Sequence, residues 1–389
     1  MFQKILIKSG SNRNEKGLCI PNLVDMMFYY KEVHVIVSDF ELKQLLDAFG
    51  EDVLYGLITN HLLILHPCDQ HTGAMRIPEG NYLVDTFHHQ DIDSIDSLLY
   101  QYHRQIVHDS TKNMEFTNKF SKVLELYQYP KLLTESIICD ISDDSKFANL
   151  TKSFLLQYYP NYSDIENVEI HAEPIDTLLK SVFRFESNLD LDELNKIHKK
   201  NGYEKEFSYD TILIAIGETA QDCYLTAELQ SEMITNQRWS EMYKFRMNQV
   251  INQSVQSQDK IDRFQKAIAV KFFSPGVAFV SGVFTAREVL EVLTLKDSAK
   301  FKEWLSKLPV DTELSNEISE AYKESYKQKW PIKVGRSLVQ IVAGLIPGVG
   351  MILGPGATIL DSLIGDRIGK GWNPTMFVNK VLNDKRLKK

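Results

Sequence analysis

A long uncharged segment near the C-terminal end of this sequence restricts what that part of the chain can form. No charged side chain occurs from Ser337 to Leu360, a run of 24 residues. A continuous helix of that length would measure about 36 Å and would cross a hydrocarbon layer about 30 Å thick. The stretch GLIPGVGMILGPG, residues 344–356, nevertheless contains five glycines and two prolines. At about 1 kcal/mol for each glycine and about 3 kcal/mol for each proline, one straight helix is strongly disfavoured.

We therefore expect a glycine-rich helical hairpin whose arms, about 12 residues each, are too short to span a bilayer. The small residues permit close helix contacts, which suit self-association, and the basic residues that flank them favour an anionic membrane surface. In the folded protein we expect the hairpin to pack against the protein's own helical bundle, and membrane contact or self-association are the functional alternatives. The candidate residues for membrane contact or self-association are Arg336, Gly344, Pro347, Gly348, Gly350, Gly354, Pro355, Gly356, Arg367 and Lys370.

Charge is distributed unevenly along the chain. The net charge is −8, which argues against nucleic acid as a partner because phosphate neutralisation needs a basic surface. From Lys333 to Lys389, however, nine lysines and arginines stand against three aspartates and no glutamate. We expect a protein partner or self-association, with an anionic membrane surface as a further partner of the basic tail.

Cysteine usage and the N-terminal residues predict the location. The four cysteines form no CxxC pair, and the first residues lack the apolar run of a signal peptide. These patterns favour reduced thiols in a bacterial cytoplasm, with the inner membrane as a peripheral location.

Hydrophobic periodicity predicts an α+β protein with three parts. The expected parts are an N-terminal mixed α/β sheet domain (1–160), a mainly helical bundle domain with a short strand pair (161–330), and the glycine-rich hairpin with its basic tail (331–389). The predicted strands are Lys4–Ser9, Glu32–Ser38, His61–Pro67, Tyr82–Thr86, Ser136–Ile141, Val168–Pro174 and Lys180–Ser187.

Apolar residues three and four positions apart predict the helices. Asp39 is the expected N-cap of the first of them. The predicted helices are Phe40–Asn60, Ser94–Val107, Glu115–Tyr127, Asp210–Thr235, Arg238–Gln253, Asp259–Phe272, Thr285–Leu293 and Thr312–Lys329.

Histidines are concentrated in the N-terminal part, where seven of the ten lie between His61 and His108. Imidazole, thiolate and carboxylate groups are zinc and iron ligands, so this region holds the candidate metal site. Its candidate ligands are His66, Cys68, His71, His88 and Asp91. No spacing of the HExxH or CxxC type occurs among them, and we therefore expect no cofactor, with a metal as the alternative.

The predicted helix Asp210–Thr235 carries several carboxylates. Glu218, Asp222 and Glu232 fall within about 80° of one another at 100° per residue. They are expected to form a solvated face, and Mg²⁺ binding or acid–base chemistry is the alternative. No phosphate-loop or dinucleotide motif is complete, because GDRIGKG (365–371) has the wrong spacing and Leu353 replaces a required glycine.

These features favour a non-enzymatic sensor or effector without catalytic residues. Its N-terminal part is expected to recognise a partner or signal, and its C-terminal hairpin to respond by self-association or membrane contact, as in bacterial antiviral defence. The alternative is a metal-dependent hydrolase or nuclease that uses the N-terminal histidine and aspartate cluster.

Overall fold

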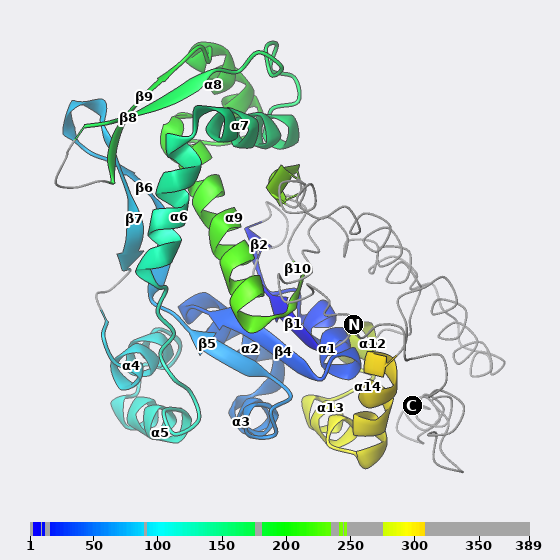
Figure 1. The fold of residues 1–389 in the computed structure, drawn as a ribbon. Helices are drawn as coiled ribbons and strands as arrows, with labels where there is room; N and C mark the ends of the chain where they lie inside the picture. The colour runs from blue at the N-terminus through cyan, green and yellow to red at the C-terminus, as the bar shows by residue number, and fades with distance from the viewer. Residues whose placement is uncertain are drawn as a thin grey trace.

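The computed structural model describes residues 3–8, 10–11, 16–88, 92–175, 181–234, 241–243, 245–246 and 275–307. Within them the chain combines two four-stranded sheets with many helices, so the predicted α+β class is confirmed (Figure 1). The predicted hairpin and the predicted helices Asp259–Phe272 and Thr312–Lys329 lie outside the described residues, as does most of Arg238–Gln253.

The first sheet is entirely parallel. Its strands lie in the order β10-β1-β4-β5, so the last of them along the chain pairs with the first. The strands are β1 (Lys4–Ile7), β4 (Glu32–Val37), β5 (Ile64–Pro67) and β10 (Glu232–Ile234). Strand β4 has buried residues on both of its faces, because both sides of the sheet are covered.

Helices cover one face of this sheet and share a core with Val33, Val35 and Val37. Ser38 begins α2 through a capping box, and Gly50, with φ of 72°, separates α2 from α3. These helices are α1 (Ile20–Tyr29), α2 (Asp39–Phe49), α3 (Glu51–Thr59), α12 (Pro275–Val280), α13 (Ala286–Leu293) and α14 (Lys296–Lys307). Helices α4 (Ile95–Ile106) and α5 (Ser110–Phe120) extend the same core.

The second sheet is antiparallel, in the order β6-β7-β9-β8. Its strands are β6 (Gln70–Arg76), β7 (Tyr82–His88), β8 (Ile170–Pro174) and β9 (Val182–Ser187). It packs with α6 (Lys131–Ser142), α7 (Asp144–Tyr158) and α8 (Leu191–Lys200). The remaining short elements are β2 (Gly10–Ser11), β3 (Lys16–Gly17) and the turn of 3-10 helix η1 (Pro78–Gly80). Residue 160 is the predicted end of the first domain. Each four-stranded sheet contains strands that precede this residue in the sequence and strands that follow it.

Helix α9 (Tyr209–Leu229) runs between the two sheets and leads into β10 (Figure 1). It contacts β6 of the second sheet and β1 of the first. Ile212, Ile216 and Leu225 are fully buried on it, as expected for a helix that is enclosed on several sides. Through α9 the two sheets share one core.

One predicted strand is wrong. Residues Ser136–Ile141 belong to helix α6, in which Leu133, Ile137 and Ile141 repeat at four-residue spacing and are all buried. The short apolar run resembles a buried strand, but its length alone does not distinguish the two.

Two helix boundaries are also corrected. Ser38 is the N-cap of α2 in place of Asp39, because its hydroxyl accepts the backbone N–H of Phe40 and Glu41 closes the capping box. The predicted helix Asp210–Thr235 ends at Leu229, where Gln230 adopts a left-handed conformation with φ of 49°. The residues that follow form β10, whose pairing with β1 is a long-range contact.

Candidate functional site

Side chains at the carboxyl edge of the parallel sheet converge on one cavity. Lys8, Ser38 and Cys68 each follow directly after a strand, namely β1, β4 and β5. Because parallel strands end at the same edge, these residues lie together although they are distant in sequence. All three line a cavity of about 290 Å³, to which Ile36 and Glu41 also contribute.

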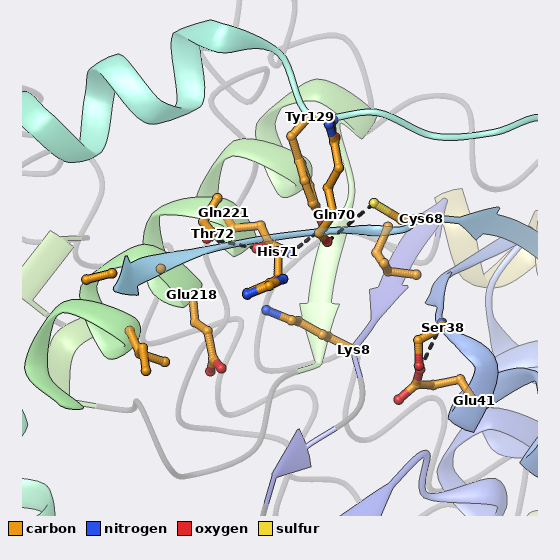
Figure 2. A pocket seen from close by; sticks show the side chains of 14 residues that line it. Lys8, Ser38, Glu41, Cys68, Gln70, His71, Thr72, Tyr129, Glu218 and Gln221 are labelled. Atoms are coloured by element: carbon orange, nitrogen blue, oxygen red, sulfur yellow. Dashed lines mark hydrogen bonds between the residues drawn. The ribbon is translucent and has the colours of Figure 1, made fainter. Parts of the chain in front are cut away.

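The other walls come from β6, α9 and the loop before α6. Strand β6 contributes Gln70 to Ala74, α9 contributes Ile214, Glu218 and Gln221, and Tyr129 closes the far side (Figure 2). The cavity therefore lies between the parallel sheet and α9, with the second sheet supplying one strand of its lining.

A buried ion pair joins the end of β1 to α9. Lys8 Nζ lies 2.7 Å from Asp222 Oδ1, and the Asp222 side chain is 1% exposed. The second oxygen of Asp222 accepts a hydrogen bond from the Tyr243 hydroxyl. Burial lowers the pKa of the Lys8 ammonium, but the carboxylates of Asp222, Glu218 and Glu41 raise it, and the net shift is upward. Lys8 is therefore charged at neutral pH.

The N-terminus of α2 carries a carboxylate on the opposite side. Glu41 Oε2 accepts a hydrogen bond from the Ser38 backbone N–H at 2.9 Å and another from the Ser38 hydroxyl. The Glu41 residue is only 7% exposed. Its other oxygen points away from Ser38 (Figure 2). The capping box thus holds the chain's own carboxylate beside the N-terminus of α2.

Neutral side chains build the wall beside β6. The Thr72 hydroxyl donates to Gln221 Oε1 at 3.0 Å, and Gln221 Nε2 donates to the Tyr129 hydroxyl. The Tyr129 backbone N–H donates to Gln70 Oε1 at 2.5 Å. These side chains hydrogen-bond to one another, so this wall gives the cavity a fixed shape.

Cys68 is not an activated nucleophile. Burial raises the pKa of its thiol to about 11, although hydrogen bonds that involve Gln70 and Tyr129 oppose the shift. At neutral pH the group is a thiol, and its hydrogen bond to Gln70 O measures 3.6 Å.

The structure separates the predicted metal ligands. His66 is not among the residues that line the cavity, and it stacks on His34, with His34 Nδ1 2.9 Å from His66 Nε2. His71 lines the cavity, and its ring lies against Phe87. His88 Nε2 is 3.1 Å from Gln70 Nε2 at the end of β7.

Asp91 lies outside the described residues. Among the residues that the structure describes, no three histidine, cysteine or acidic side chains are arranged to hold a metal ion. The metal site thus stays a prediction, and its described candidate ligands have other neighbours.

The prediction that the α9 carboxylates form a solvated face is wrong. Asp222 is buried in its ion pair with Lys8, and Glu218 lines the cavity. Glu232 lies on β10 and accepts a hydrogen bond from the Tyr30 hydroxyl, and the exposed Glu228 accepts one from Tyr127. The helix is covered by the two sheets, so its polar side chains must find internal partners.

The candidate residues for membrane contact or self-association, from Arg336 to Lys370, lie outside the described residues. Among the helices that the structure describes, none combines the length and the apolar composition that a bilayer crossing requires.

Sequence reasoning missed Lys8, Ser38 and Glu41 as site residues. The available signal was the position of Lys8 and Ser38 at the C-terminal ends of two predicted strands, with Glu41 three residues further on, because ligands of α/β proteins bind outside the carboxyl ends of parallel strands. That signal becomes specific only when the strands are known to be parallel neighbours.

Comparisons with known proteins identify no family or function for the chain. The chain matches no protein-family model, no curated protein and no solved structure.

Proposed function

We propose that this chain is a sensor that binds a small polar molecule in the cavity at the carboxyl edge of its parallel sheet. The observation that carries the proposal is the convergence of Lys8, Glu41 and Glu218 from three separate elements around one cavity. Charged side chains cost free energy when they are taken from water, so a group of them beside a cavity is a candidate ligand site.

The strand order supports this position. Counted along the chain, the parallel strands lie in the order 4-1-2-3, which is the arrangement of the first strands in doubly wound sheets. In such sheets the chain leaves strand 1 in one direction and later returns on its other side, and ligands bind outside the carboxyl ends at this switch point. Lys8 follows β1 there, and this support rests on analogy between folds.

The size and lining fit a small metabolite. A volume of about 290 Å³ is at the lower end of the range for ligand pockets. Ile36, Ala74 and Ile214 supply apolar surface, while the charged groups supply orientation.

The response is assigned to the C-terminal glycine-rich segment. Binding in the cavity is proposed to change self-association or membrane contact of residues 336–371, in an effector of bacterial antiviral defence. The basic residues of that segment and the absence of charge from Ser337 to Leu360 support this output.

The test of the sensor is a thermal-shift screen of the full chain against small amines, amino acids, sugars, nucleosides and phosphorylated compounds. A ligand at 100 times its Kd stabilises the folded state by about 2.7 kcal/mol. Gly73→Val adds a branched side chain to the lining of the cavity, where a Cβ at Gly73 makes ordinary contacts with Ile214 at 3.7 Å and His71 at 4.0 Å. We expect this variant to lose the ligand-induced shift while it keeps the melting temperature of the free protein.

Met75→Val is the matched control, since Met75 is an exposed residue on the same strand. It should respond to ligand as the unchanged chain does. If both variants respond alike to every stabilising compound, the cavity is not the binding site.

A second candidate function, acid–base catalysis, is favoured by His71 and Glu218 in the same cavity as Lys8. Nuclear magnetic resonance of the bound compound over several hours distinguishes it from binding alone. Product that forms with the unchanged chain and is lost in His71→Gln would identify an enzyme. An unaltered spectrum would show that the compound is bound without reaction, as expected for a sensor.

A further inference from the structure

Helix α14 buries two polar side chains on the face that packs against the core. Ser298 is 0% exposed and Lys302 is 4% exposed, and the apolar Phe301 and Leu305 are buried beside them. Because residues four positions apart lie on the same side of a helix, Ser298 and Lys302 share one face, about one turn apart. Lysine is almost never fully buried unless it is paired, so this position calls for an explanation.

Neither polar group has a partner in the part of the chain that the structure describes. The Ser298 hydroxyl is buried without a hydrogen bond. Burial lowers the pKa of the Lys302 ammonium to about 7, and no hydrogen bond or nearby charge among the described residues opposes this shift. The carboxylate that follows Lys302 in sequence, Glu303, is exposed and pairs with Lys307. Docking of α14 therefore takes an amine and a hydroxyl from water without replacing their hydrogen bonds.

Two buried ion pairs elsewhere in the fold show the contrast. Asp140 Oδ2 lies 2.6 Å from an Arg246 nitrogen, and Asp222 Oδ1 lies 2.7 Å from Lys8 Nζ. Removal of one partner from such a pair leaves a buried charge without compensation, which is destabilising. Lys302 is in that condition whenever its amine is protonated.

Apolar contacts oppose this cost and hold α14 in place. The ring centroids of Phe301 and of Tyr29 on α1 are 6.4 Å apart, and Trp304 packs against the same core. Helix α14 contacts α1 and α13, and the three helices lie together in Figure 1. The docked position of α14 is thus a balance between apolar burial, which favours it, and two buried polar groups, which disfavour it.

We propose that α14 is a latch, meaning a helix that leaves the core at a lower free energy than the helices beside it and so releases the chain that follows Lys307. Helix α14 is the last helix that the structure describes, and the sequence continues from it towards the glycine-rich segment, residues 336–371. Elements that move in regulation are drawn from the least stable parts of a fold. The release of the segment rests on the proposed function, in which that segment gives the response.

Hydrogen–deuterium exchange of the full chain at pH 7, read by mass spectrometry of peptides, tests the latch. We expect the backbone amides of α14 to exchange at least about tenfold faster than those of α1 and α13, because local opening exposes them. Equal protection of the three helices overturns the proposal.

Lys302→Met keeps a long, flexible side chain and removes the amine, so it should slow the exchange of α14 by at least about tenfold. Lys300→Met, at an exposed position on the same helix, is the matched control and should leave the exchange unchanged. Fraying of a helix end does not depend on its buried face, so equal exchange in the two variants overturns the proposal.

The release is measured by co-sedimentation of the full chain with phosphatidylserine vesicles, and by analytical ultracentrifugation without them. Binding or self-association that needs the opened state weakens in proportion to its population, so Lys302→Met should reduce it about tenfold relative to Lys300→Met. Slowed exchange with unchanged vesicle binding and self-association overturns the release of the segment. Failure of the unchanged chain to do either overturns the response assigned under the proposed function, while the exchange rates still decide the latch.

Discussion

Lys8 Nζ and Asp222 Oδ1 lie 2.7 Å apart and connect the first strand of the parallel sheet to the helix that precedes its last strand. Tyr243 donates to the same carboxylate, so a third segment of the chain meets at this point. The pair thus belongs both to the folded core and to the wall of the cavity.

Removal of one partner of this pair should destabilise the protein. Lys8→Met leaves the Asp222 carboxylate buried without its counter-charge, and such losses cost about 3–5 kcal/mol. Urea unfolding followed by circular dichroism measures the change. Lys43→Met, at an exposed position on α2, is the control and should change stability by less than about 0.5 kcal/mol. Equal stability of the two variants would contradict a structural role for the pair.

The stacked histidines predict a pH dependence of stability. Burial lowers the pKa of His66 to about 4, and the neighbouring His34 adds to the shift. In the unfolded chain a histidine titrates near pH 6.5, so below that pH the unfolded state binds a proton that the folded state excludes. Stability should therefore fall by up to about 3 kcal/mol as the pH drops from about 6.5 to 4.

His66→Phe keeps an aromatic ring and should flatten this part of the stability profile, measured by urea unfolding at several pH values. His61→Asn is the control, since His61 is exposed and its φ of 53° suits asparagine. An unchanged slope in His66→Phe would show that other groups cause the acid loss.

Because Lys302 is buried, we expect its replacement by an apolar residue to stabilise the protein. Burial lowers the pKa of its ammonium to about 7, and the residue is 4% exposed on α14. The unfolded chain binds this proton up to about pH 10.5, so stability should rise with pH between 7 and 10.5. Lys302→Met should be more stable by up to about 4 kcal/mol at pH 7, and the gain should shrink towards pH 10.

The exposed Lys300 on the same helix provides the control variant, Lys300→Met. Thermal unfolding at pH 7 and pH 10 compares the two. A Lys302→Met variant that is less stable than the unchanged chain at pH 7 would contradict the prediction.

The contact between α1 and α12 predicts the effect of a single methyl group. A Cβ at Gly276 would lie 1.8 Å from the Pro21 backbone oxygen, and the Gly276 N–H donates to Asp25 Oδ1 at 2.7 Å. Gly276→Ala must move backbone and should cost about 1–3 kcal/mol. Gly73→Ala, where the nearest atom is 3.7 Å away, should be neutral or stabilising by up to about 1 kcal/mol in urea unfolding. Equal effects of the two substitutions would contradict this packing.

Much of the secondary structure follows from local pattern. The alternation in Glu32–Val37 and the spacing in Ala286–Leu293 are correctly predicted as strand and helix, because both depend on neighbours within a few residues. The capping box of Thr285 and Glu288 is of the same local kind. Helix α6 and strand β10 were missed, since a short apolar run is ambiguous and β10 is stabilised by its pairing with β1.

The sequence by itself determined the α+β class, most of the early strands, and the presence of carboxylates on the helix that became α9. Only the tertiary structure decided that these carboxylates face inward. The parallel pairing of β10 with β1 brings α9 across the carboxyl edge of the sheet, where Asp222 meets Lys8 and Glu218 meets the cavity. A local pattern specifies which residues share a helix face, but the packing of distant elements determines whether that face meets water or a buried charge.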